Sequence, residues 1–203
     1  MEIKDTFLTI AAAAEGLYKD RGSKFLAFAY PINNDEEVKS LVQHLKKEHH
    51  SARHHCYAYR IGNEGEHYRA NDDGEPSGTA GKPILGQLLS HNLTNILVVV
   101  VRYFGGTLLG VSGLINAYKN STIEAINQAE IIEKIIENNY LLEFEYPIQN
   151  NVMKVIKDHN LEIIKTAYDL NCKIEIAVRL NNEEQVSGLF QKIDGVTIAK
   201  REK

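Results

Sequence analysis

The chain contains little cysteine, little proline and no tryptophan. Its 203 residues include two Cys and four Pro, and 43% of them are hydrophobic. Cys56 and Cys172 lie far apart, so there is no disulfide framework and no Cys-x-x-Cys metal pair. This composition excludes a disordered, collagen-like or low-complexity chain. It predicts a globular protein of a reducing compartment that builds its core without disulfides or metal.

Long hydrophobic runs are also absent. The longest apolar stretch, residues 96–101, is far too short to cross a bilayer. Residues 1–5 resemble neither a signal peptide nor a lipidation motif. We therefore expect a soluble, cytoplasmic protein that does not contact a membrane.

The chain has no excess of positive charge. It carries 23 Lys and Arg against 27 Asp and Glu, which gives a net charge of −4. A strongly basic protein that coats nucleic acid is excluded, whereas a local basic groove is compatible with this balance.

Strand and helix patterns alternate through the first two thirds of the chain. Asn33 or Asn34 is expected to cap the first helix, and Pro83 fits the first turn of the second. The run that ends at Arg102 is so apolar that it predicts a central strand buried on both faces. The expected strands are 7–17, 24–32, 54–61, 67–70 and 95–102, and the expected helices carry apolar stripes of Val38, Leu41, Val42 and Leu45, of Ile84, Leu85, Leu88 and Leu89, and of Val111, Leu114, Ile115 and Tyr118.

The pattern changes near Asn138 and Asn139. From there the sequence predicts strands over 140–146, 162–170, 172–180 and 196–200, with helices opened by Pro147 and over 182–192. This βαββαβ order is the ferredoxin-like signature. We predict an α+β protein of two domains, residues 1–137 and residues 138–203.

Glycine and polar residues concentrate in two loops, 69–83 and 102–110, each of which leads into a helix. Free N–H groups at a helix start attract anions, and glycine allows a phosphate to approach. Arg102 ends the buried strand, at an edge where ligands tend to bind in open α/β layers. Alternatively, Arg102 pairs with a loop acid such as Asp72 or Asp73.

The strand that begins at His54 has an aromatic face. His55, Tyr57 and Tyr59 alternate along it and lie near Arg53 and Arg69 in the expected fold. Such a face could stack bases, and it fits packing beneath a helix equally well. Cys56 lies on the opposite face, where a small buried thiol is usually inert.

Common enzyme signatures are missing. The sequence contains no Walker phosphate loop, no G-x-S-x-G nucleophile elbow and no H-E-x-x-H motif. Asp72, Asp73 and Glu75 could hold Mg²⁺, although loop solvation and helix capping explain such acids as well. We predict no catalytic residue, no cofactor and no metal site, and we favour a binding protein over an enzyme.

Three separated segments, residues 52–59, 71–85 and 98–106, resemble the IMPACT/YigZ family. The resemblance covers about residues 15–120, and the chain from Tyr140 onward is similar to the small C-terminal domain of the bacterial branch. It implies an N-terminal fold like domain 2 of a small-subunit ribosomal protein and domain IV of elongation factor G, and a C-terminal fold like domain V of an elongation factor. The eukaryotic branch is associated with translational control through a starvation-responsive initiation-factor kinase pathway and carries an additional N-terminal RWD domain. We expect no such domain before residue 5, and therefore no role in the kinase pathway.

These observations lead to the hypothesis of a translation-associated binding or regulatory protein that contacts RNA or the ribosome. Cations would contact phosphates, aromatic rings would stack on bases, and glycines would allow close approach. The predicted site comprises Arg53, His55, Tyr57, Tyr59, Arg60, Arg69, Ser77, Gly78, Thr79, Lys82, Arg102, Gly105 and Gly106. Two alternatives remain: a metal-assisted hydrolase of a phosphate or peptide substrate that uses Asp72, Asp73 and Glu75, and a regulator that binds a protein partner through its C-terminal domain.

Overall fold

A computed structural model describes residues 5–201, which divide into two compact units. The larger unit comprises residues 7–134. The smaller unit comprises residues 135–201 together with residues 5 and 6. The division thus falls just before the boundary that the sequence predicts. Residues 1–4, where we expected no signal segment, lie outside the described residues.

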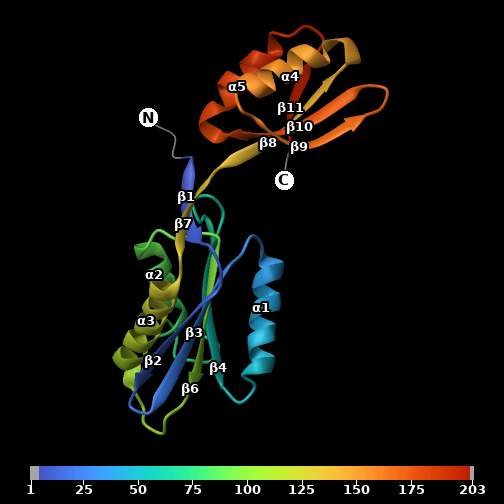
Figure 1. Ribbon diagram of the computed structural model, residues 1–203. Coiled ribbons are helices and arrows are strands. Elements are labelled where there is room, and N and C mark those ends of the chain that lie inside the picture. The colour runs from blue at the N-terminus through green and yellow to red at the C-terminus, as the bar shows by residue number, and fades with distance from the viewer. Residues whose placement is uncertain (1–4, 202–203) are drawn as a thin grey trace. The chain divides into compact units, whose positions relative to one another are not determined.

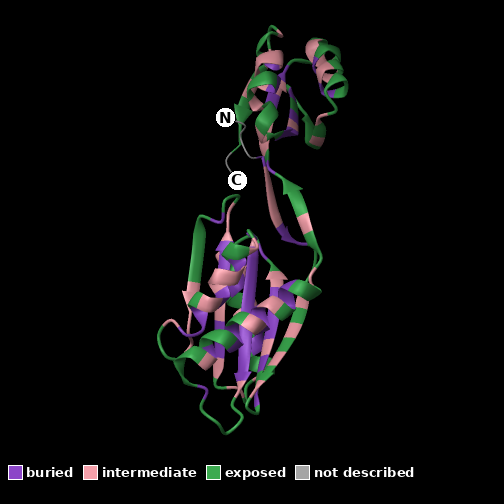
Figure 2. Ribbon diagram, turned by 90° about the vertical axis from the view of Figure 1, so that its left-hand side faces the viewer, coloured by how far each residue is buried: buried purple, intermediate pink, exposed green. Residues whose placement is uncertain are grey.

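The larger unit is built on a five-stranded sheet with the order β2-β3-β6-β4-β5, in which all neighbours are antiparallel. Its strands are β2 (Ala14–Asp20), β3 (Ser23–Pro31), β4 (His54–Ile61), β5 (His67–Asn71) and β6 (Ile96–Tyr103). The central strand β6 is buried from Ile96 to Arg102, as Figure 2 shows in purple. Its continuous apolar run predicted this position, because helices cover both faces of the sheet.

Helix α1 (Asp35–Glu48) covers one face of this sheet, and helices α2 (Gly81–Ser90) and α3 (Gly110–Gln128) cover the other (Figure 1). Asn34 caps α1, since its side chain accepts a hydrogen bond from the backbone N–H of Glu37. Pro83 lies in the first turn of α2, and the stripe of Val38 and Leu45 is buried against the sheet. These features confirm the predicted helices.

The single strand predicted over residues 7–17 is wrong. Strand β1 (Thr6–Ile10) pairs with β7 (Ile131–Ile135) in a separate two-stranded sheet, and the chain enters the five-stranded sheet only at Ala14. Residues 11–13 are three exposed alanines, which have low β propensity and no side chain that could pack across a strand pair. The pairing of β1 with β7 links residues more than a hundred positions apart, so no local pattern announced it.

The smaller unit has the βαββαβ order that the sequence predicts. Its elements are β8 (Glu137–Phe144), α4 (Gln149–Asp158), β9 (Glu162–Tyr168), β10 (Cys172–Arg179), α5 (Glu183–Gln191) and β11 (Thr197–Lys200), with 3₁₀ turns at Tyr146–Ile148 and Leu180–Asn182. The strands form one antiparallel sheet in the order β11-β8-β10-β9. Leu142, Ile174 and Phe190 are fully buried in a core of its own.

This separate core predicts that a fragment of residues 135–203 folds alone. We expect a cooperative thermal transition and a circular dichroism spectrum with both helix and strand, because the main apolar contacts of the unit lie within the fragment. The full chain is the control. A broad, non-cooperative transition with a coil-like spectrum would contradict an autonomous domain.

Within residues 5–201, no helix is both long enough and apolar enough to span a membrane.

Candidate functional site

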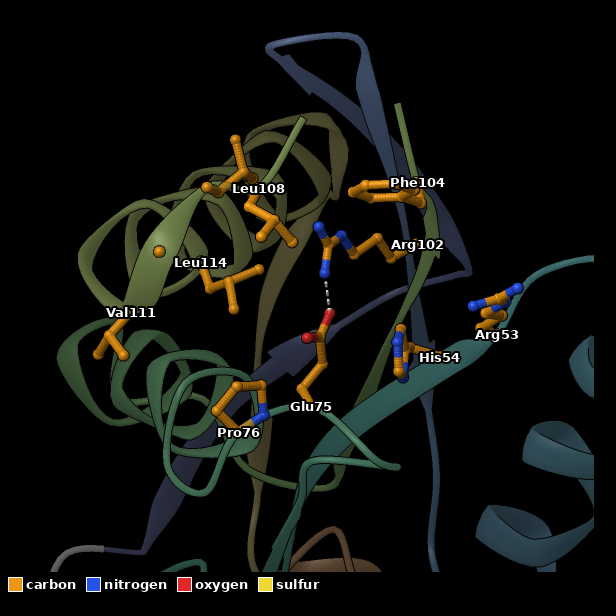
Figure 3. A pocket seen from close by; sticks show the side chains of 11 residues that line it. Arg53, His54, Glu75, Pro76, Arg102, Phe104, Leu108, Val111 and Leu114 are labelled. Atoms are coloured by element: carbon orange, nitrogen blue, oxygen red, sulfur yellow. Dashed lines mark hydrogen bonds and ion pairs between the residues drawn. The ribbon is translucent and has the colours of Figure 1, made fainter. Parts of the chain in front are cut away.

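A pocket of about 500 Å³ opens in the larger unit where β6 ends and β4 begins. The two glycine-rich loops singled out in the sequence meet here, since Glu75 and Pro76 come from the first and the segment from Phe104 to Gly110 comes from the second (Figure 3). The lining residues are Arg53, His54, Glu75, Pro76, Arg102, Phe104, Leu108, Leu109, Gly110, Val111 and Leu114.

A buried ion pair forms the polar part of the pocket wall. Arg102 Nη1 donates to Glu75 Oε1 at 2.6 Å, and the two side chains are only 7% and 4% exposed. The Tyr118 hydroxyl donates to the same oxygen at 2.8 Å, and Cys56 Sγ donates to that hydroxyl at 3.3 Å. Burial raises the pKa of the Cys56 thiol, which fits an inert cysteine. Arg102 therefore pairs with a loop acid, but this acid is Glu75 rather than Asp72 or Asp73.

Asp72 occupies the N-terminus of α2. Its carboxylate accepts hydrogen bonds from the backbone N–H groups of Gly78 at 2.9 Å, Ala80 at 3.0 Å and Gly81 at 2.8 Å. Burial alone would raise the pKa of Asp72, but these bonds outweigh burial and hold the pKa below its ordinary value. The predicted phosphate site at this helix start is wrong, because the carboxylate of the chain already fills it.

The three loop acids do not converge. Asp73 accepts from Lys46 Nζ at 2.8 Å and from the backbone N–H of His55 at 2.7 Å, while Asp72 and Glu75 bind the partners given above. Within the described residues, no group of three His, Cys, Asp or Glu side chains is arranged to hold a metal ion. The metal-assisted hydrolase hypothesis required these three acids to surround one metal ion, and their arrangement does not support it.

The aromatic face of β4 lies under α1. His55 is 4% exposed and Tyr59 is 5% exposed, and Tyr57 packs partly buried in the same layer. Burial lowers the pKa of His55 and raises the pKa of Tyr59 to about 12. The predicted base-stacking role of His55 and Tyr59 is wrong, because α1 covers them and the pocket lies on the opposite face of the sheet.

The predicted cations are spread over different parts of the unit. Arg53 is exposed and lines the pocket, and Lys82 is exposed on the first turn of α2. Arg60 is buried and donates to the carbonyl oxygens of Leu93 and Glu64 at 2.7 and 2.6 Å, so it has a structural role. Arg69 is exposed on β5 opposite Tyr59, and thus on the α1 side of the sheet.

The remaining predicted residues shape the loops rather than line the pocket. A Cβ at Gly105 would lie 1.9 Å from the carbonyl carbon of Gly22, so this glycine is needed where the chain packs against itself. Gly78 and Gly106 have positive φ angles of 76° and 87°. Thr79 Oγ1 donates to the carbonyl oxygen of Pro76 at 2.7 Å, and Ser77 is exposed on the same loop. Glycine here serves backbone geometry.

The sequence interpretation missed several surface residues around the pocket. Phe104, Leu108 and Val111 are 55%, 80% and 60% exposed, although Val111 was predicted to share the buried stripe of its helix. A second hollow of about 490 Å³ adjoins the first, since Phe104 lines both. Exposed Lys19 and Lys24 line this second hollow. These two lysines lie next to Phe104 because Lys19 pairs with Lys24 across β2 and β3, and Lys24 pairs with Tyr103 across β3 and β6. The only sequence signal for this arrangement was the alternation of residues on either side of the turn between β2 and β3.

Comparisons with known proteins agree with the resemblance. The family model described as "Impact N-terminal domain" matches residues 21–126. IMPACT family member YvyE of Bacillus subtilis is 32% identical over 92% of this chain and 84% of its own length. IMPACT family member YigZ of Escherichia coli is 32% identical over 86% of each chain. A crystal structure titled only as that of a hypothetical protein is 29% identical, with a TM-score of 0.75, and covers 99% of this chain and 100% of its own. The chain therefore belongs to the IMPACT family.

Proposed function

We propose that this protein is a translation-associated regulatory protein that contacts RNA, free or within the ribosome. Family membership supports the link to translation, because the eukaryotic branch that the sequence resembles is associated with translational control. The observation that carries RNA contact is the end of the sheet around Phe104, here called the pocket end, where one hollow opens on the α2 and α3 face and the other on the α1 face. It consists of the two hollows that share Phe104, with Lys19, Lys24 and Arg53 around them.

Three exposed cations around one exposed ring form the combination that binds single-stranded RNA. Cations neutralise phosphates and release counterions, and an aromatic ring stacks on any base. In the part of the chain that the structure describes, Lys19, Lys24 and Arg53 have no ion-pair partner, so their charges are available. The net charge of −4 limits this attraction to the pocket end and favours modest affinity.

The salt dependence of binding tests this proposal. A fluorescently labelled single-stranded RNA is titrated with the protein at 50 to 200 mM salt, and co-sedimentation with ribosomes is measured in parallel. Three phosphate contacts predict that the logarithm of affinity falls with the logarithm of salt with a slope of about −2. Absence of binding to both RNA and ribosomes would contradict the proposal, and RNA cleavage that requires Mg²⁺ would favour the hydrolase alternative.

Arg53→Ala is expected to weaken RNA binding by about tenfold for every sequence and to reduce the steepness of the salt slope by about 0.7. The reason is the loss of a phosphate contact, which carries no sequence information. Arg69→Ala is the matched control, because Arg69 is also exposed but lies on β5, at the edge of the sheet opposite β2, and lines neither hollow. Equal losses in the two variants would show diffuse electrostatic attraction instead of a site at the pocket end.

The smaller unit offers a second, separate surface for a protein partner. Helices α4 and α5 cover one face of its sheet, and the other face carries a hollow of about 210 Å³ with the exposed cations Lys165, Lys173 and Arg201. Lys173 pairs with Glu143 at 2.7 Å, and Glu175 also lines the hollow. An acidic protein segment would therefore be attracted mainly by Lys165 and Arg201. Cross-linking of the full chain in cell extract, with Lys165→Glu as the comparison, tests this alternative: a protein cross-link lost in the variant would support it.

A further inference from the structure

Deep in the pocket, the pair of Glu75 and Arg102 presents one free acceptor and one free donor between apolar side chains, while Arg53 and His54 also line the pocket. Glu75 Oε1 already accepts from Arg102 and Tyr118, whereas Glu75 Oε2 and Arg102 Nη2 have no hydrogen-bond partner among residues 5–201. Neither of these two atoms is sealed off from solvent, and both side chains line the pocket (Figure 3). Any group that binds here must therefore satisfy an acceptor and a donor that lie side by side.

This pair selects against charged ligands. The charges of Glu75 and Arg102 cancel, so the pair offers no net attraction to a phosphate or a carboxylate, and Glu75 Oε2 would repel either. The guanidinium of Arg102 would in turn repel an ammonium group. The pair fits a neutral group that carries an N–H beside an oxygen or nitrogen acceptor.

The rest of the pocket favours a flat ligand with apolar faces. Pro76, Leu109 and Leu114 provide apolar wall, and Leu108 and Val111 extend it towards solvent. The ring of Phe104 lies above the Arg102 guanidinium, 5.7 Å from its central carbon, and offers an exposed aromatic surface (Figure 3). Apolar walls with a small number of placed polar groups are typical of small-ligand pockets.

We propose that this pocket binds a single unpaired nucleobase of RNA, with its Watson–Crick edge against Glu75 and Arg102 and its ring near Phe104. Each of the four bases carries a donor next to an acceptor on that edge, between two apolar faces. In a duplex the same edge is occupied by the partner base, so the pocket selects single strands. The inference rests on the proposed RNA contact and names the part of RNA that this surface takes.

The position of Phe104 connects the base to the cations. Phe104 lines both hollows, and the second hollow is bounded by Lys19 and Lys24, while Arg53 stands at the rim of the first. A nucleotide with its base in the pocket therefore has cations within reach of its phosphates on either side of Phe104. The pocket reads the base, and the exposed cations hold the backbone.

Nucleoside analogues test the proposal without changing the protein. Uridine, 5-methyluridine and N3-methyluridine are titrated against the full chain, and binding is measured by saturation-transfer NMR. Uridine and 5-methyluridine should bind alike, whereas N3-methyluridine should bind at least about tenfold more weakly, because a methyl group replaces the N–H that faces Glu75. Equal binding of all three analogues, or no binding of any, would overturn the proposal.

Val111→Trp tests the place of binding. Val111 is 60% exposed at the wall of the pocket, so a larger side chain narrows the opening without entering the core. Uridine binding should fall by about tenfold or more, because the indole takes up space that the base needs to enter the pocket. Ile115→Trp is the matched control, because Ile115 is also exposed on α3, one turn further along, but does not line the pocket. The same loss in both variants would contradict binding in this pocket.

The two proposals fail in different ways. RNA binding that depends on Arg53, combined with no nucleoside binding and no effect of Val111→Trp, overturns the base pocket and leaves the proposed function standing. Nucleoside binding without binding to RNA oligonucleotides supports the pocket and contradicts the proposed function. Saturation transfer to N-acetylglutamine amide with none to uridine overturns the nucleobase assignment in favour of a peptide side chain.

Discussion

Arg102→Ala is expected to lower the free energy of unfolding by about 3–5 kcal/mol, the cost of removing one partner of a buried ion pair. Glu75 is 4% exposed on its side chain, and without Arg102 its carboxylate keeps only the hydrogen bond from Tyr118. The loss is measured by urea denaturation at pH 7. Arg53→Ala, which changes an exposed arginine of the same pocket, should alter the free energy of unfolding by no more than about 0.5 kcal/mol.

A double variant separates the charge from the packing. Arg102→Met combined with Glu75→Leu removes both charges and keeps most of the apolar volume, so it should recover a large part of the stability lost by Arg102→Ala. Some loss should remain, since the buried Tyr118 hydroxyl would lack its acceptor. A double variant less stable than Arg102→Ala would contradict the buried-pair explanation.

RNA titrations of the Arg102→Ala variant, made beside the urea denaturation, show whether Arg102 also contributes to RNA binding. If the variant is strongly destabilised but still binds RNA with unchanged affinity at a temperature where it is folded, Arg102 serves the fold alone. A loss of both stability and RNA affinity would show that the buried pair stabilises the fold and also binds the base. Its position, 7% exposed yet on the pocket wall, leads us to expect a loss in both properties.

Local patterns predicted most of the fold. The apolar run ending at Arg102 predicted a buried central strand, and Asn34 and Pro83 marked the starts of two helices. The pairing of β1 with β7 was not predictable, because it joins distant segments that have no distinguishing pattern of their own. The helix stripes were only partly correct: Leu114 and Tyr118 are buried, whereas Val111 and Ile115 on α3 and Leu89 at the end of α2 are exposed.

The sequence located the loops that form the candidate site, but it did not show which face of the sheet each side chain would lie on. Glycine and charge located both loops of the pocket, yet alternation along β4 only divided its residues into two sets and could not tell which set α1 would cover. His55 and Tyr59 therefore appeared equally suited to stacking and to burial. The partner of Arg102 was equally open, since three acids within four positions are indistinguishable until the backbone directs each one. Tertiary packing decided both points.

Asp72→Ala is expected to lower the free energy of unfolding by about 2–3 kcal/mol at pH 7, because one carboxylate accepts three backbone hydrogen bonds and caps α2. The folded pKa of Asp72 lies below the ordinary value of 3.8, since these bonds outweigh the opposing effect of burial. The stabilisation is therefore fully present above the unfolded pKa and is lost as the pH falls through the folded pKa. Urea midpoints of the two proteins should differ by a constant amount from about pH 5 upward and should converge below about pH 4. Asp72→Asn, which keeps a neutral acceptor oxygen, should lose less stability, and its urea midpoint should not converge with that of the wild type in this way. If the urea midpoints of the wild type and Asp72→Ala differ as much at pH 3 as at pH 7, the charge of Asp72 does not hold the loop.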